Sequence, residues 1–173
     1  MDSIEYWEMD GPLGPMLLAA QADQLTGIWY DAQKYYPKIS EDAGWQRRNT
    51  PLLKETAGQL EAYFRDGRSA FDLPLAPRGT DFQKAIWKIL ETIPAGETMA
   101  YGDVARRYGD LKAVRAVGSA VGHNPISIVI PCHRVIGANG SLTGYAGGMD
   151  RKAWLLDLES GQQPMAFSIP GKG

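Results

Sequence analysis

A single cysteine stands beside a histidine in this chain, and the two residue types could act as a thiol nucleophile and its base. Cys132 is the only cysteine among the 173 residues, and it lies in the string Ile130-Pro131-Cys132-His133-Arg134-Val135-Ile136. A free thiol is mostly protonated at neutral pH, so it needs a base or positive surroundings before it reacts. His133 and Arg134 can supply these. A carboxylate should orient the imidazole, and Glu159 is the candidate.

Simpler interpretations of these residues remain open. A lone cysteine after an apolar run is usually a small buried hydrophobic residue, and a lone histidine is often a structural hydrogen-bonding group. Residues 126–130 have the length of a buried strand that ends at Cys132. Neighbouring side chains on a strand point to opposite faces, so contact between Cys132 and His133 would need a water or a local bend.

The composition excludes several protein classes. Hydrophobic residues make up 44% of the chain, enough for a core, and one cysteine excludes an internal disulfide framework, which favours a reducing compartment. The acidic N-terminus lacks the layout of a signal peptide, and no apolar run has the length of a membrane span. We therefore expect a cytoplasmic protein of one compact domain or two small ones, with no membrane contact.

The charges are unevenly distributed along a chain whose net charge is −2. Residues 1–79 carry eight basic against twelve acidic residues, whereas residues 104–152 carry seven basic against two acidic ones. This asymmetry favours a working face on the C-terminal part. An ordinary solvated surface would explain so mild an excess equally well.

The N-terminal part is predicted to be a small sheet with one helix. Apolar runs at 16–20 and 25–30 have the length of buried strands, and a polar loop should follow over 32–49. Helical spacing of apolar residues predicts an amphipathic helix over about 51–66. Residues 71–79 contain two prolines and a glycine and are interpreted as a linker.

The C-terminal part is predicted to be mostly helical. Thr80 can cap a helix that ends before Pro94 and Gly96, and its apolar face is Phe82, Ala85, Ile86, Ile89 and Leu90. Short helices should follow near 103–108 and from Lys112 to the break at Asn124-Pro125. Residues 137–149 are a glycine-rich loop. Asp150 can cap a last helix, whose core residues are Trp154, Leu155 and Leu158.

The two short helices joined by residues 109–111 have the layout of a helix-turn-helix. The second should place Val114, Val117, Gly118 and Val121 on its core face and small residues on its outer face. These small residues are Ala113, Ala116, Ser119 and Ala120, with Arg115 as the one long side chain. A small-residue face lets a helix approach a narrow groove closely. Alternatively, these alanines only favour helix formation and pack against a neighbouring element.

Five motifs, in order, resemble the O6-alkylguanine-DNA alkyltransferases, also called methylated-DNA–protein-cysteine methyltransferases. The motifs are Arg115-Ala116-Val117-Gly118, Asn124-Pro125, Ile130-Pro131-Cys132-His133-Arg134-Val135, Gly144-Tyr145-Ala146-Gly147-Gly148 and Lys152-Ala153-Trp154-Leu155-Leu156. They cover about residues 80–160, whereas residues 1–79 match only through their strand-rich layout. The length and the short tail resemble those of bacterial, constitutive-type members.

The resemblance implies an α/β (α+β) fold in two parts. Residues 1–79 would form a ribonuclease-H-like domain of a small β-sheet plus helix, with the linker at 71–79. Residues 80–160 would form a mostly helical winged or helix-turn-helix domain with the DNA-binding and active sites. Residues 161–173 are expected to be a frayed tail.

The resemblance also implies DNA repair by direct reversal. The helix-turn-helix would bind the minor groove of double-stranded DNA, and the O6-alkylated guanine would flip out of the stack. Cys132 would then keep the alkyl group as a thioether. A thioether has no good leaving group, so each molecule should react once. Activity on O4-alkylthymine, the preferred alkyl size and cooperativity on DNA stay open, and a monomer is expected in solution.

The family's site residues map onto positions of this chain. By similarity, Glu159 orients His133, which acts through a water on Cys132, while Tyr101 protonates the departing guanine at N3 and Asn124 braces the site. Arg115 would fill the vacated stack, and the small-residue face would press into the groove. The pocket would be lined by Val135, Tyr145, Ala146, Gly147 and Lys152.

Departures from the family pattern bear on metals and on the pocket. Some relatives hold a structural zinc in the N-terminal part, but this chain has no cysteine there and no histidine before His123, so no metal and no cofactor are expected. Ala146 stands where some relatives have serine, which removes a hydroxyl contact to the guanine. His123 is expected to be a surface residue.

Two other functions compete with this one. A non-catalytic DNA-binding protein that flags lesions or regulates genes would bind without reacting, although such relatives lack the cysteine. A thiol hydrolase using Cys132 and His133 would turn over esters or peptides and would have no use for Arg115.

Overall fold

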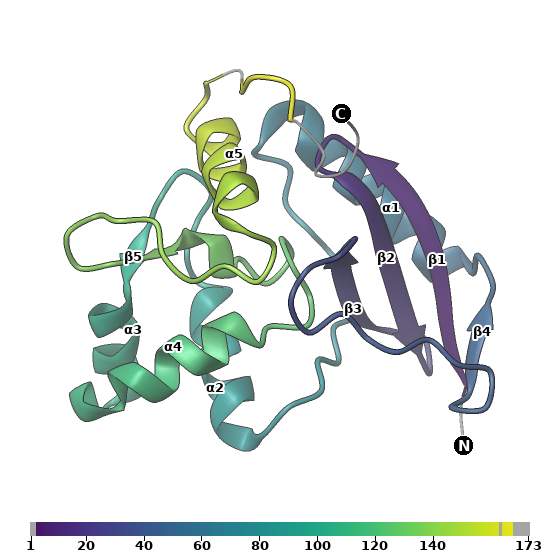
Figure 1. Ribbon diagram of the computed structural model, residues 1–173, viewed down its shortest axis with the longest axis horizontal. Coiled ribbons are helices and arrows are strands. Elements are labelled where there is room, and N and C mark those ends of the chain that lie inside the picture. Colours follow the sequence, from purple (N-terminus) through teal and green to yellow (C-terminus); the bar gives the residue numbers. More distant parts are fainter. Residues whose placement is uncertain (1–2, 163, 168–173) are drawn as a thin grey trace.

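The structure, a computed structural model, describes residues 3–162 and 164–167. Its N-terminal half is a four-stranded sheet in the order β3-β2-β1-β4 with helix α1 packed against it (Figure 1). Neighbouring strands are antiparallel except β4, which runs parallel to β1. The bounds are β1 Ile4–Gly11, β2 Gly14–Gln21, β3 Gln24–Tyr30, β4 Trp45–Arg47 and α1 Pro51–Asp66.

Side chains of β2 alternate between two apolar clusters, as the period of a strand requires. Met16 and Leu18 face the main core, while Leu17 and Ala19 face a small cluster around Trp45. Burial on both faces explains why β2 is almost continuously apolar. It also explains β4, a strand missed inside the predicted loop over 32–49, because it brings Trp45 over the second face.

Helix α1 has the bounds predicted from its apolar spacing. The side chain of Thr50 caps it by accepting a hydrogen bond from the Leu53 N–H, and Gly67 ends it with φ of 68°. A Cβ on Gly67 would lie 2.6 Å from the carbonyl oxygen of Leu158. Glycine is therefore needed twice here, for the left-handed turn and for the close approach of α1 to the last helix.

The C-terminal half consists of helices around a two-stranded parallel sheet. Figure 1 shows α2, α3 and α4 grouped on the side of the molecule away from β1 and β4. The bounds are α2 Asp81–Leu90, β5 Met99–Ala100, α3 Tyr101–Tyr108, α4 Val114–Gly122, β6 Val135–Ile136 and α5 Met149–Glu159, with 3₁₀ turns η1 at Leu111–Ala113 and η2 at Cys132–Arg134. Thr80 and Gln83 form a capping box at the start of α2.

One hydrophobic core runs through both halves, and backbone hydrogen bonds join them. Ile28 of β3 donates to the Pro125 carbonyl at 2.9 Å and accepts from the Ser127 N–H at 3.2 Å. Leu25 is bonded in the same way to Pro74 and Ala76, so the segment predicted as a linker is held against the edge of β3.

Residues 126–130 are buried but do not form the predicted strand. Ile128 has φ of 72°, and the segment turns so that the Ile130 N–H donates to the Ile126 carbonyl. The Asn124 side chain accepts from the Ile126 N–H at 3.0 Å and donates to the Ile130 carbonyl at 2.7 Å. Because Asn124 satisfies backbone groups that a strand would pair, the apolar run coils around it.

Three smaller predictions are also corrected. Gly148, not Asp150, precedes α5, so Asp150 lies in its first turn. Val114 is exposed rather than part of the core face of α4. In the predicted tail, Phe167 packs against the core, while residues 163 and 168–173 lie outside the described residues.

Candidate active site

Cys132 lies in a turn rather than on a strand. It begins η2 and immediately precedes β6, which pairs in parallel with β5, and β5 in turn leads directly into Tyr101. The two short strands therefore bring the segments that carry Cys132 and Tyr101 side by side. Cys132 is 5% exposed. The 3₁₀ turn is a local bend at this point, and among the described residues no hydrogen bond joins the thiol to His133 Nδ1.

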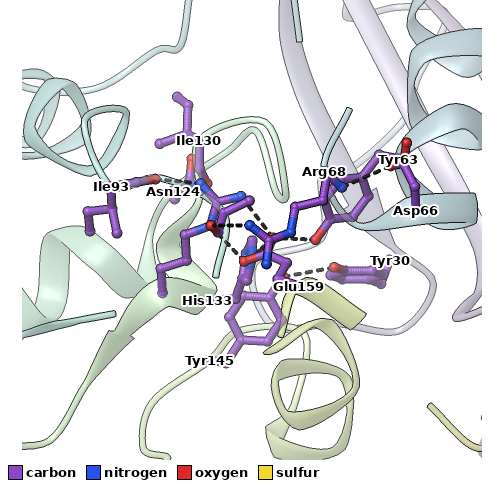
Figure 2. Close-up of polar contacts among 12 residues, drawn as sticks. Tyr30, Tyr63, Asp66, Arg68, Ile93, Asn124, Ile130, His133, Tyr145 and Glu159 are labelled. Atoms are coloured by element: carbon purple, nitrogen blue, oxygen red, sulfur yellow. Dashed lines mark hydrogen bonds and ion pairs between the residues drawn. The ribbon is translucent and has the colours of Figure 1, made fainter. Parts of the chain in front are cut away.

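Glu159, at the end of α5, lies at the centre of a buried hydrogen-bond network. Its Oε2 accepts from His133 Nε2 at 2.8 Å and from the Tyr63 hydroxyl at 2.5 Å. Arg134 donates to both carboxylate oxygens, each at 2.8 Å. Figure 2 shows His133 and Tyr63 reaching Glu159 from different elements. The predicted pairing of Glu159 with His133 is thus present in the geometry.

The network sets the protonation states of Glu159 and His133. Burial favours the neutral acid, but the hydrogen bonds from Arg134 and His133 outweigh it and lower the pKa of Glu159 to about 2. Burial lowers the pKa of His133 despite the carboxylate. A carboxylate only accepts, so Nε2 carries the hydrogen, and the buried Nδ1 has no hydrogen-bond partner among the described residues. His133 is therefore a neutral imidazole with a free lone pair.

Cys132 needs such a base. Burial raises the pKa of its thiol to about 11, although a hydrogen bond with the Asn124 side chain and the charge of Lys152 act in the opposite direction. At neutral pH the resting thiol therefore keeps its proton, and an acceptor must remove it during the reaction.

Lys152 holds the glycine-rich loop against β6. Its Nζ donates to the Val135 carbonyl at 2.6 Å and to the Thr143 carbonyl at 2.7 Å. The side chain is fully buried, and burial lowers the pKa of Lys152 to about 8. The Thr143 carbonyl also accepts from the Tyr101 hydroxyl at 3.0 Å, so Lys152 and Tyr101 meet at the same peptide group.

Tyr145 is a buried part of the same site. Its hydroxyl lies 2.8 Å from the hydroxyl of Tyr30, and its ring lies edge-on to His133 at 6.5 Å between centroids. Tyr145 and Ala146 line a cavity of about 180 Å³. The other three predicted pocket residues, Val135, Gly147 and Lys152, are not among its lining residues.

The predicted outer face of α4 is only partly correct. Arg115, Ala116 and Ser119 are exposed, but Ala120 is 1% exposed, and its carbonyl accepts from Trp87 Nε1 at 2.8 Å. Ala113 also packs against the core. Ala113, in η1, and Ala120, in α4, therefore both contact the core.

Two family models match nearly the whole chain. Residues 5–77 match the 6-O-methylguanine DNA methyltransferase, ribonuclease-like domain, and residues 81–161 match the DNA binding domain of the same family. The chain belongs to the 6-O-methylguanine DNA methyltransferase family. Both halves of the predicted fold are confirmed by this match and by the solved structures below.

Curated members of the family are similar over their full length. A methylated-DNA–protein-cysteine methyltransferase of Mycolicibacterium paratuberculosis is 46% identical over 96% of this chain and 98% of its own length. One of Methanosarcina barkeri is 50% identical over 89% and 96%. The crystal structure of Mycobacterium tuberculosis OGT in complex with DNA superposes with a TM-score of 0.82 at 45% identity, covering 92% of this chain and 95% of that one.

Sequence reasoning missed the contribution of the N-terminal half to the site of this family member. Tyr63 and Tyr30 come from α1 and β3, yet their hydroxyls bond to Glu159 and Tyr145. In sequence each is one more aromatic residue in an apolar pattern, so no local signal separates them from ordinary core residues.

The described residues include neither a metal-binding cluster nor a helix that could span a membrane. No group of three or more histidine, cysteine, aspartate or glutamate residues in the described part could hold a metal ion. Within the same residues, no helix combines the length and the hydropathy needed to cross a membrane.

Proposed function

We propose that this chain repairs O6-alkylguanine in double-stranded DNA by moving the alkyl group irreversibly to Cys132. The observation that carries the proposal is the buried Cys132 next to a His133–Glu159 pair whose free imidazole nitrogen can accept a proton. The full-length similarity to methylated-DNA–protein-cysteine methyltransferases supports the same reaction.

The reaction is a displacement at carbon. His133 Nδ1 takes the thiol proton through a water, and the sulfur attacks the alkyl carbon on O6. An S–C bond forms as the C–O6 bond breaks, and the electron pair of that bond stays with the guanine. Tyr101 gives the guanine a proton at N3 and is reprotonated from solvent. The products are a thioether on Cys132 and an unmodified guanine.

The proton acceptor is kept neutral and oriented by its surroundings. The bond from Nε2 to Glu159 leaves only Nδ1 to accept, and the carboxylate stabilises the imidazolium that forms. Asn124 acts on the thiol and at the same time holds the turn of residues 126–130. The same contacts that fold the segment therefore prepare the sulfur.

Binding to DNA is assigned to α3, η1 and α4. Ala116 and Ser119 present short side chains that let α4 approach the minor groove, and Arg115 next to Ala116 is long enough to enter the stack that the flipped base leaves. The DNA complex of the Mycobacterium tuberculosis relative supports a DNA partner. We assign the protein to the cytoplasm, because its single cysteine favours a reducing compartment, and we expect a monomer.

Intact-protein mass spectrometry tests the reaction. After incubation with a duplex containing one O6-methylguanine, the protein should gain one methyl group, located on Cys132 by peptide mapping, and should not react again. Cys132→Ala should bind the same duplex and gain no mass. Tight binding by the parent without an adduct would favour a lesion-flagging protein, and sustained turnover on esters would favour a hydrolase.

A further inference from the structure

A stacked pair of aromatic rings closes one side of the cavity next to the reactive site. Tyr35, in the loop after β3, lies on His123 with ring centroids 4.1 Å apart and planes inclined by 25°. The cavity of about 180 Å³ is lined by Lys34, Tyr35, Gly118, Ser119, Gly122, His123, Gly144, Tyr145 and Ala146. Three separate parts of the chain therefore form its walls.

The cavity lies between the DNA-binding helix and Tyr145, a neighbour of His133, whereas Cys132 and His133 are not among its lining residues. One wall is the exposed side of α4 at Ser119, and the opposite wall contains Tyr145, whose ring lies against His133. A nucleotide that leaves a duplex bound to α4 would enter at the first wall and meet Tyr145 at the second. The third wall, Tyr35, comes from the N-terminal half.

Tyr35 is held in place by its neighbours. Its φ of 61° is in the left-handed region, which a tyrosine adopts only when its surroundings impose it. The Lys34 N–H donates to the Ala146 carbonyl at 3.2 Å, and His123 Nδ1 lies 2.7 Å from the Ser119 carbonyl. Both rings of the stack are thereby tied to the walls on either side of them.

The cavity is small for the ligand it would receive. Its volume of about 180 Å³ is below the roughly 300 Å³ at which ligand pockets in general start. A base with a small O6 substituent would fill the space. A larger substituent would press on the wall that has solvent behind it, and that wall is Tyr35, which is 60% exposed.

We propose that Tyr35, docked on His123, is the residue that limits the size of the O6 substituent this protein accepts. The inference rests on the proposed repair function, because it assigns the cavity to the flipped base. If Tyr35 acts through steric contact, its effect on the rate of alkyl transfer should grow with the size of the O6 substituent. The effect should be smallest for a methyl group.

Two substrates that differ only in the size of the O6 substituent test the proposal. Single-turnover rates of Cys132 alkylation are measured with matched duplexes that contain one O6-methylguanine or one O6-benzylguanine. Tyr35→Ala should raise the benzyl-to-methyl rate ratio about tenfold, the discrimination that a small change in a hydrophobic pocket typically provides. Tyr35→Phe keeps the ring and should keep the parental ratio.

The next residue in the chain supplies a matched control. Tyr36 is 37% exposed and does not line the cavity, so Tyr36→Ala should leave the ratio unchanged. An unchanged or lower ratio in Tyr35→Ala, with normal methyl transfer, would overturn the assignment of Tyr35 alone. Absence of a methyl adduct in the parent would instead overturn the proposed function.

Discussion

The burial of the Lys152 ammonium group should appear in how the free energy of unfolding depends on pH. Its pKa is lowered from 10.5 to about 8 in the folded protein, so between these values the unfolded chain binds more protons than the folded one. The free energy of unfolding must therefore rise with pH across this window. Relative to Lys152→Met, we expect the parent to gain about 1–2 kcal/mol between pH 8 and pH 9.5.

Chemical denaturation at a series of pH values makes this comparison. The Cys132 thiol opposes the trend, because its pKa is raised in the folded state, but it is present in both proteins. The exposed Lys112 provides a control, since Lys112→Met should run parallel to the parent. Parallel curves for Lys152→Met would show that Lys152 titrates normally.

For individual residues, the sequence predicted the nucleophile and its base but only some of the residues that hold them in place. The residue types of Cys132 and His133 indicated a nucleophile and a base, and Glu159 followed from the need for an orienting carboxylate. Tyr63 and Arg134 donate to that carboxylate as well. Their roles depend on contacts over 96 and 25 residues of chain, which no local pattern encodes.

Helix α4 offers a direct test of which face meets DNA. Ala116 is exposed and Ala120 is buried. Ala116→Glu should leave the melting temperature unchanged and weaken duplex binding about tenfold or more, because a carboxylate would face the phosphates. Titration of a labelled duplex measures the affinity.

Matched substitutions separate charge from bulk on this helix. Ala116→Gln adds nearly the same volume without charge and should weaken binding less than Ala116→Glu. Ala120→Glu would bury an unpaired carboxylate and should abolish folding. Equal affinities for Ala116→Glu and the parent would place DNA on another surface.

The positions of the helices in the sequence were more predictable than the face that each helix buries or the contacts that it makes. The apolar spacing of α1 and the capping residues of α2 are local signals, and both helices appear where they were expected. The inward turn of Ala120 depends on how α4 is rotated after the preceding 3₁₀ turn. The curl of residues 126–130 depends on the Asn124 side chain, which competes with strand pairing.

The basic half of the molecule has a smaller working charge than its composition indicates. Of its seven basic residues, Arg134, Arg151 and Lys152 are buried and bonded inside the protein. The remaining four, Arg106, Arg107, Lys112 and Arg115, are exposed on or between α3 and α4. A sequence count cannot distinguish cations that organise a core from cations that meet a partner.

Salt dependence measures that difference. Each neutralised phosphate contributes about −0.9 to the slope of log K against log salt. Because Arg115 is assigned to the base stack, the other three exposed cations predict a slope of about −3. Lys112→Ala should reduce its magnitude by about one. A parental slope near −6 would mean that the buried cations, or others, also reach the phosphates.

The pairing of Ile28 with Pro125 and Ser127 makes β3 a neighbour of the reactive turn through the main chain itself. We therefore expect substitutions in β3 to alter the position of the Cys132 sulfur through this backbone contact. A selection for altered reactivity should randomise β3 as well as the pocket.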